Sequence, residues 1–215
     1  MQIIEILGTL VGLAYLWLEY RASIYLWIAS IIMPAIYLVV YYNAGLYADF
    51  GINIYYLAIA IYGWAAWRFG FKLFGRNDEV QNQALPITHT PRKVWAVAAL
   101  ASCALTFIIA WVLNSFTDST VPWADAFTTA LSVVGMWMLA RKYIEQWWVW
   151  MVVDVVCVGL YIYKGLYFTA ALYALYAVVA VMGWANWKKL MKKITKNQMM
   201  NVKKKPKMKF VMKFM

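Results

Sequence analysis

Seven long apolar runs dominate the sequence and leave little room for anything else. They cover residues 3–20, 25–42, 50–69, 94–114, 125–140, 147–163 and 167–187. Of the 215 residues, 65% are hydrophobic and 13% are charged, a composition that excludes an ordinary soluble domain. About 20 apolar residues are needed to cross a bilayer as a helix, and in lipid a helix satisfies its own backbone hydrogen bonds. The sequence therefore predicts an all-α integral membrane protein with seven transmembrane helices.

Basic residues mark one side of this predicted bundle. Of the 20 lysines and arginines, all except Lys164 flank or lie in alternate connections or in the C-terminal tail. By the positive-inside rule, the C-terminus is cytoplasmic, and seven spans then place the N-terminus outside. The net charge of +11 is explained by this topology, so we expect no nucleic-acid partner.

An internal repeat divides the chain. Residues 45–67 (GLYADFGINIYYLAIAIYGWAAW) align without a gap with residues 165–187 (GLYFTAALYALYAVVAVMGWANW), and the same offset pairs Arg21 with Arg141 and Trp27 with Trp147. Because one span separates the two copies, both insert with the same orientation, as parallel repeats do. The predicted order is a first three-helix repeat at 1–69, a cytoplasmic loop at 70–93, a linker helix at 94–116, a second repeat at 117–188 and a basic tail at 189–215.

One carboxylate stands out in the middle of an apolar run. Asp154 lies in WVWMVVDVVCVGLYIYKGLY, and a charged Asp at the bilayer centre costs roughly 2.5 to 3.5 kcal/mol on insertion scales, so it should face a cavity. Helical spacing puts Trp150 and Tyr161 on the same face as Asp154. Similar stripes on other spans add further candidate pocket residues, which are Asn53, Tyr56, Thr129, Ser132, Tyr173 and Tyr176. We interpret them as one pocket for a small, flat, cationic ligand; the alternative for Asp154 is hydrogen bonding between helices.

Other notable residues have structural explanations. Gly63 and Gly183 are expected to allow close helix packing. Asp125 lies near the outer end of its span and is expected to be a solvated helix terminus. The tryptophans near span ends are expected to be interfacial anchors, namely Trp27, Trp67, Trp123, Trp147 and Trp187.

Four motifs together resemble the Pnu vitamin transporters over residues 1 to about 190. These are GLYADxGxNxYY…YGWxxW at 45–67, TTxLS at 128–132, ARK at 140–142 and WxxxDxxxxxxYxxKGLY at 150–167. The resemblance implies a full-length SWEET-like plan (3+1+3), a bacterial inner-membrane location and a homotrimer. It also implies facilitated diffusion of a vitamin that an intracellular kinase traps by phosphorylation. No cofactor or metal is expected.

The substrate expectation rests on one departure from the family pattern. Nicotinamide riboside members carry Asn at the position of Asp154, and a carboxylate suits the exocyclic amine of thiamine. This departure and the loop PITHTPRK at 86–93 favour thiamine, with nicotinamide riboside as the alternative. The sole histidine, His89, lies in a predicted loop without partners for catalysis, so we expect no enzyme. A membrane sensor that binds without transporting is the remaining alternative.

Overall fold

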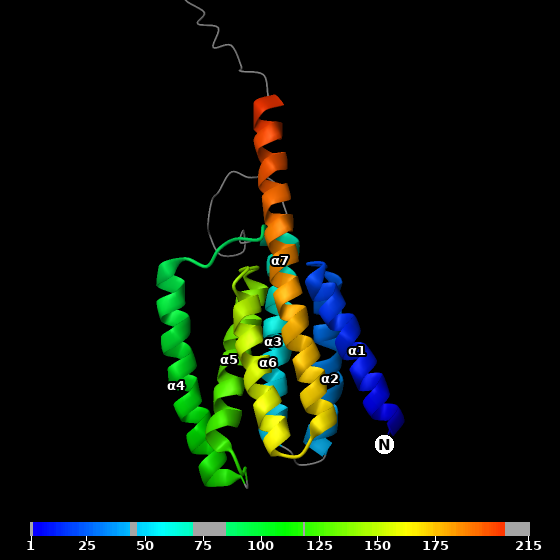
Figure 1. The fold of residues 1–215 in the computed structure, drawn as a ribbon, viewed down its shortest axis with the longest axis vertical. Coiled ribbons are helices and arrows are strands. Elements are labelled where there is room, and N and C mark those ends of the chain that lie inside the picture. The colour runs from blue at the N-terminus through cyan, green and yellow to red at the C-terminus, as the bar shows by residue number, and fades with distance from the viewer. Residues whose placement is uncertain (1, 44–46, 71–84, 118, 205–215) are drawn as a thin grey trace, which may run out of the picture.

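The fold is a bundle of seven helices (Figure 1). It is seen in a computed structural model that describes residues 2–43, 47–70, 85–117 and 119–204. The helices are α1 (Gln2–Tyr20), α2 (Tyr25–Asn43), α3 (Tyr47–Phe69), α4 (Arg92–Phe116), α5 (Pro122–Ala140), α6 (Gln146–Tyr163) and α7 (Tyr167–Lys204). Each predicted apolar run lies within one helix, which confirms the all-helical prediction.

The main difference from the expected helix boundaries is at the end of α7. The apolar run ends at 187, but the helix continues to Lys204 and projects from the bundle (Figure 1). Residues 188–204 contain neither proline nor glycine, and lysine and methionine are good helix formers, so nothing stops the helix when its apolar run ends. The expected tail at 189–215 is therefore helical over its first part.

Five helices among the described residues are long and apolar enough to cross a membrane. They are Phe50–Phe69, Arg92–Phe116, Pro122–Ala140, Gln146–Tyr163 and Tyr167–Ile194, and Tyr25–Val39 is a shorter apolar helix. The predicted spans at 3–20 and 25–42 include side chains outside the described part of the chain and stay predictions.

Helix packing follows the sequence repeat. α2 packs against α3 and α6 against α7, while α1 contacts α2 and α5 contacts α6. Two further contacts join the halves, because α3 packs against α5 and α7 packs against α1. α4 packs against α5 at one edge of the bundle (Figure 1).

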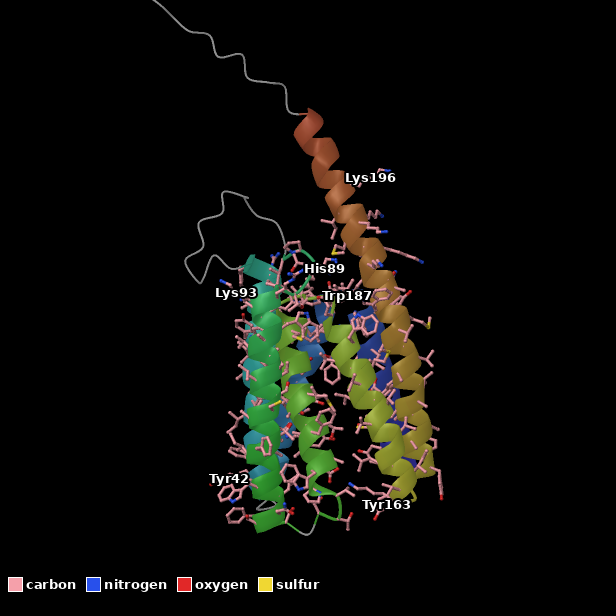
Figure 2. All side chains as sticks on the ribbon, turned by 60° about the vertical axis from the view of Figure 1, so that its left-hand side comes forward. Tyr42, His89, Lys93, Tyr163, Trp187 and Lys196 are labelled. Carbon is pink, nitrogen blue, oxygen red and sulfur yellow. The ribbon has the colours of Figure 1, made fainter. Side chains whose placement is uncertain are left out.

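Four tryptophans form a buried cluster at the end of the bundle from which α7 projects. Trp27, Trp67, Trp147 and Trp187 are at most 2% exposed. The ring centroids of Trp67 and Trp187 lie 6.2 Å apart, and Trp27 and Trp147 meet these rings edge-on at 5.6 and 5.8 Å. We call this end, where Figure 2 labels Trp187, the Trp187 end, and the opposite one the Tyr163 end.

The expectation that these four tryptophans anchor the protein at the membrane interface was wrong. The small glycines on the neighbouring helix make room for the rings instead. A Cβ atom added to Gly63 would lie 2.3 Å from the ring of Trp27, and one added to Gly183 would lie 2.6 Å from the ring of Trp147. The expected packing role of both glycines is confirmed. Trp123 is 54% exposed and lies outside the cluster.

Two hydrogen bonds cross between the halves in a reciprocal way. The indole Nε1 of Trp67 donates to the carbonyl oxygen of Leu139 at 3.3 Å, and that of Trp187 donates to the carbonyl oxygen of Glu19 at 2.9 Å. Donors and acceptors are both 120 positions apart in the sequence. The last helix of each half is therefore bonded to the first helix of the other.

The segment before α4 is fastened to the turn between α5 and α6. Thr88 forms a parallel β-bridge with Tyr143. The Glu145 carboxylate accepts hydrogen bonds from the backbone N–H and the hydroxyl of Thr90, both at 2.8 Å, and contacts Nδ1 of His89 at 2.6 Å. Burial raises the pKa of Glu145, but these hydrogen bonds outweigh it and hold the pKa below its ordinary value. The carboxylate thus stays ionised and holds the segment in place.

Candidate functional site

A cavity of about 230 Å³ lies between α1, α5, α6 and α7. Its wall comprises Gly12, Tyr15, Leu16, Glu19, Ser132, Trp147, Trp150, Val153, Asp154, Tyr173, Tyr176 and Ala180. The residues from α1 face those from the second half of the chain. The space is predominantly apolar and aromatic with a few polar groups, as small-molecule sites usually are.

Asp154 supplies one carboxyl group to this wall. It is 6% exposed and lies one helical turn after Trp150, so both side chains reach the same cavity. Among the described residues Asp154 has no hydrogen-bond partner. A carboxyl group that joined helices by hydrogen bonding would need such a partner. Contact between Asp154 and a ligand stays a prediction.

Glu19 supplies a second carboxyl group, which the sequence analysis missed. It is 2% exposed, lines the cavity from α1, and its Oε1 has no hydrogen-bond partner in the described part of the chain. Glu19 stands next to the end of an apolar run, where an acidic residue is easily assigned to the membrane surface. One signal could have revealed it, because the repeat equivalent of Glu19 is the apolar Leu139.

Tyrosine rings form much of the remaining wall. Tyr173 and Tyr176 from α7 lie with centroids 5.6 Å apart, and Tyr161 stacks on Tyr173 at 5.1 Å. The hydroxyl of Tyr176 lies so near α1 that a Cβ atom at Gly12 would come within 3.0 Å of it. Tyr15 also lines the cavity, and its hydroxyl donates to the sulfur of Met136 at 3.9 Å.

Five of the predicted site residues share this cavity, and four do not line it. Trp150, Asp154, Ser132, Tyr173 and Tyr176 belong to the wall, whereas Tyr161, Asn53, Tyr56 and Thr129 do not. Tyr161 lies behind Tyr173 and supports its ring. The hydroxyl of Thr129 donates to the carbonyl oxygen of Asp125 at 2.7 Å, within its own helix.

Asn53 and Tyr56 lie on α3, which packs against α2 and α5 and contributes no described residue to the wall. We expected the polar and aromatic stripes on several spans to converge on one pocket. The cavity instead involves α1 from the first half and α5 to α7 from the second. Ligand contacts by these four residues stay predictions.

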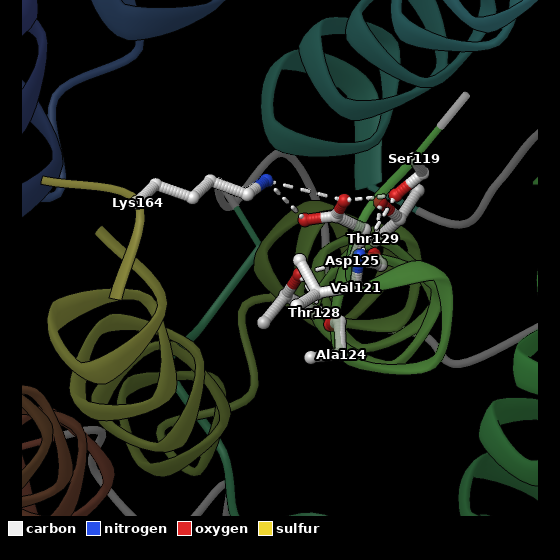
Figure 3. Close-up of polar contacts among 7 residues, drawn as sticks. All are labelled: Ser119, Val121, Ala124, Asp125, Thr128, Thr129 and Lys164. Atoms are coloured by element: carbon white, nitrogen blue, oxygen red, sulfur yellow. Dashed lines mark hydrogen bonds and ion pairs between the residues drawn. The ribbon is translucent and has the colours of Figure 1, made fainter. Parts of the chain in front are cut away.

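A polar network at the Tyr163 end includes none of the residues of the cavity wall. Figure 3 shows its contacts. The carboxylate of Asp125, in the first turn of α5, accepts a hydrogen bond from Ser119 at 2.9 Å and pairs with Lys164 at 3.1 Å. Both charged side chains are about 30% exposed, so the pair contributes at most about 1 kcal/mol. It joins the turn between α6 and α7 to the start of α5, which agrees with the expected role of Asp125 at a helix end.

These features define a multi-pass membrane protein with an aromatic, acid-containing cavity inside its helix bundle. The profile of the family described as "Nicotinamide mononucleotide transporter" matches residues 2–189. The chain belongs to this family, and the resemblance to Pnu-type vitamin transporters is confirmed.

Two relatives and one solved structure give the range of similarity. The nicotinamide riboside transporter PnuC of Escherichia coli is 24% identical over 187 residues, covering 76% of each chain. The riboflavin/roseoflavin transporter RibM of Streptomyces davaonensis is 26% identical over 187 residues, covering 85% of this chain and 83% of its own. The crystal structure of the vitamin B3 transporter PnuC superposes with a TM-score of 0.60 at 23% identity, over 86% of this chain and 80% of that one.

Proposed function

We propose that the protein carries nicotinamide riboside across the bacterial inner membrane by facilitated diffusion. The observation that carries the proposal is the cavity in which Asp154 and Glu19 stand among the rings of Trp150, Tyr15 and Tyr176. A positively charged aromatic ring is attracted both to carboxylates and to the faces of aromatic side chains, by about 0.5 to 2 kcal/mol per ring in the second case. The pyridinium ring of nicotinamide riboside has this character.

The relatives support this substrate better than thiamine, which the sequence analysis ranked first. The two relatives above are named for nicotinamide riboside and for riboflavin. Riboflavin is a neutral, three-ring compound, so it makes less use of two carboxyl groups. A cavity of about 230 Å³ also suits a compact ligand. Thiamine remains the second candidate because of one observation, the acidic Asp154 in a motif where nicotinamide riboside members carry Asn.

The proposal includes a SWEET-like arrangement of two parallel three-helix repeats joined by α4. The reciprocal tryptophan hydrogen bonds and the matching helix contacts of the two halves support it. The turns that follow α1 and α5 also match, since Ala22 and Lys142, 120 positions apart, have φ values of 50° and 56°. A homotrimer and an intracellular trapping kinase complete the proposal on the family resemblance.

Binding measurements distinguish between the candidate vitamins, and transport measurements distinguish a facilitated-diffusion transporter from a sensor. Calorimetry of the purified protein should give a complex with nicotinamide riboside, measured beside thiamine and riboflavin. Proteoliposomes should equilibrate labelled nicotinamide riboside without a sodium or proton gradient, and accumulate it beyond equilibrium only with a kinase and ATP enclosed. Uphill uptake driven by a proton gradient alone contradicts facilitated diffusion, and binding without uptake identifies a sensor.

Substitution of Asp154 tests the cavity as the binding site. Asp154→Asn should weaken binding of the vitamin by about tenfold to a hundredfold, because it removes a charge-assisted interaction worth roughly 1.5 to 3 kcal/mol. Thermal stability should stay the same or rise, since the amide is cheaper to bury than a carboxylate. The control is Asp125→Asn at the Tyr163 end, which should leave affinity unchanged. The opposite pattern, with loss of affinity only in the control, contradicts this site.

A further inference from the structure

The part of α7 that projects beyond the bundle carries exposed lysines on one side. At about 100° per residue, those between positions 188 and 196 fall within an arc of about 140°. Figure 2 shows Lys196 on this projecting part. Leu190 and Met191 lie on the other side of the helix and pack against the core cluster at the Trp187 end. The exposed lysines, which we call the lysine face, are Lys188, Lys189, Lys192, Lys193 and Lys196.

The lysine face has no counter-charge within its own helix. Residues 188–204 contain neither aspartate nor glutamate. In the described part of the chain, no ion pair involves a residue of the lysine face. Like charges four positions apart on a helix repel each other, as Lys188 and Lys192 do, and weaken the helix. The projecting part of α7 therefore offers a positive surface that an anionic partner from outside the chain would stabilise.

The same side of α7 is apolar and exposed where the helix crosses the bundle. Val178, Val181 and Met182 fall within the arc of the lysine face and are 58%, 52% and 54% exposed. In a membrane-spanning helix, apolar side chains that no protein group covers face lipid. The lysine face therefore continues the lipid-facing side of α7 past the end of the apolar run at 187.

Two tryptophans place the start of the lysine face at the membrane surface. Trp148 is 47% exposed and meets the ring of Trp184 at 5.6 Å, while Nζ of Lys188 lies 4.6 Å from the centre of the Trp184 ring. Exposed tryptophans gather at the level of lipid headgroups. Lys192 lies about 6 Å further along the helix, within the roughly 8 Å over which charge attraction persists at physiological salt. Headgroup charges can thus reach these lysines.

We infer that the lysine face binds the headgroups of anionic phospholipids in the leaflet at the Trp187 end. A phospholipid whose chains lie along Val178 and Val181 brings its phosphate to Lys188, which favours lipid over an acidic soluble protein. Each lysine near an anionic surface strengthens the attraction by about fivefold. This inference goes beyond the proposed function and does not depend on which vitamin the protein carries.

Lipid binding by the purified protein tests the inference. The full-length protein in an uncharged detergent is titrated with dioleoylphosphatidylglycerol or dioleoylphosphatidylcholine, and native mass spectrometry gives the ratio of the two affinities. The wild type should prefer the anionic lipid by at least about tenfold. The triple variant Lys188→Gln, Lys189→Gln, Lys192→Gln should lower this ratio by at least about fivefold. An unchanged ratio in this variant overturns the inference.

A variant with the same loss of charge is the control. Arg68 follows Trp67 on α3, and Arg92 and Lys93 begin α4 near the Trp187 end (Figure 2). All three are exposed. Their joint replacement by glutamine should change the ratio by less than about twofold, because these residues lie on other helices. Equal losses in both triple variants would reduce the effect to net charge and overturn the site. A wild type without preference also overturns it and leaves the lysine face to an acidic protein.

Hydrogen exchange provides a second measurement in a bilayer. Backbone amides of residues 188–204 should exchange more slowly in phosphatidylglycerol nanodiscs than in phosphatidylcholine nanodiscs, because anionic headgroups relieve the repulsion between lysines. The lysine-to-glutamine triple variant should exchange equally in both lipids. Its melting temperature in detergent should not fall below that of the wild type, since glutamine forms helices about as well as lysine. Equal exchange of the wild type in the two lipids would contradict the inference.

Discussion

Gly183 makes the burial of Trp147 possible, and, like Gly63, it is a position at which the helix packing is sensitive to one added methyl group. A Cβ atom there would lie 2.6 Å from the ring of Trp147, which is itself held against Trp187. The ring cannot move away without disturbing the cluster. Overpacking of this kind typically costs 1 to 3 kcal/mol.

We therefore expect Gly183→Ala to lower the free energy of unfolding by about 1 to 3 kcal/mol. Gly159→Ala is the matched control, because nothing lies within 4 Å of the added carbon and alanine favours a helix over glycine by roughly 0.5 to 1 kcal/mol. Thermal unfolding in detergent compares the two variants. Equal stabilities for both would show that the ring of Trp147 has room to yield.

The segment before α4 provides a prediction at the scale of structural elements. Glu145 holds it through Thr90 and His89, so Glu145→Gln should weaken the attachment and lower stability by about 1 to 2 kcal/mol at neutral pH, as expected for hydrogen bonds to a charged group. His89→Ala is the control and should have a smaller effect, because the side chain of His89 is 67% exposed.

The difference in stability between the wild type and Glu145→Gln should become smaller as the pH falls. The pKa of Glu145 is lower in the folded protein than its ordinary value of 4.5. Its stabilising contribution is therefore complete above about pH 4.5 and disappears as the pH falls through the folded value. Melting temperatures of the wild type and Glu145→Gln, measured from pH 7 down to pH 4 and below, should converge on the acid side. A constant difference would contradict a role for the ionised carboxylate.

The orientation in the membrane is a prediction about the whole molecule. α1 begins at the end of the bundle opposite to the projection of α7 (Figure 1), so the start of α1 and the end of α7 lie on different sides. The distribution of basic residues assigns the α7 side to the cytoplasm. A membrane-impermeant thiol reagent added to intact cells should label Ser119→Cys and not Lys193→Cys, in a variant lacking Cys103 and Cys157. Labelling of Lys193→Cys alone would reverse the assigned orientation.

Much of the architecture could be predicted from the sequence because it depends on properties that repeat along the chain. The length of apolar runs gave the helices, and the spacing of identical residues gave the repeat. The extension of α7 was missed because hydropathy reports burial in lipid, whereas helix propensity continues through the lysine-rich stretch to Lys204. The four buried tryptophans were misassigned because the sequence does not show whether a ring faces lipid or a glycine on the next helix.

The candidate site was only partly predictable for a related reason. Trp150 and Asp154 share one helix, so helical periodicity was enough to place them together. Glu19 reaches the same space from a helix 135 positions earlier in the sequence, and no periodicity relates the two acids. Asn53 and Tyr56 were included because their helical spacing matches that of the stripe around Asp154, but spacing along one helix does not show which helices surround the cavity.

The reciprocal tryptophan hydrogen bonds bear on how such a chain can arise. A three-helix ancestor with one tryptophan and one facing carbonyl would form both bonds in a symmetric pair of copies. Once duplication and fusion join the copies, the two walls are free to accumulate different side chains. Glu19 and Leu139 occupy equivalent positions after that divergence. A fused chain can therefore hold a ligand with two unlike ends, whereas a pair of identical copies would offer each end the same groups.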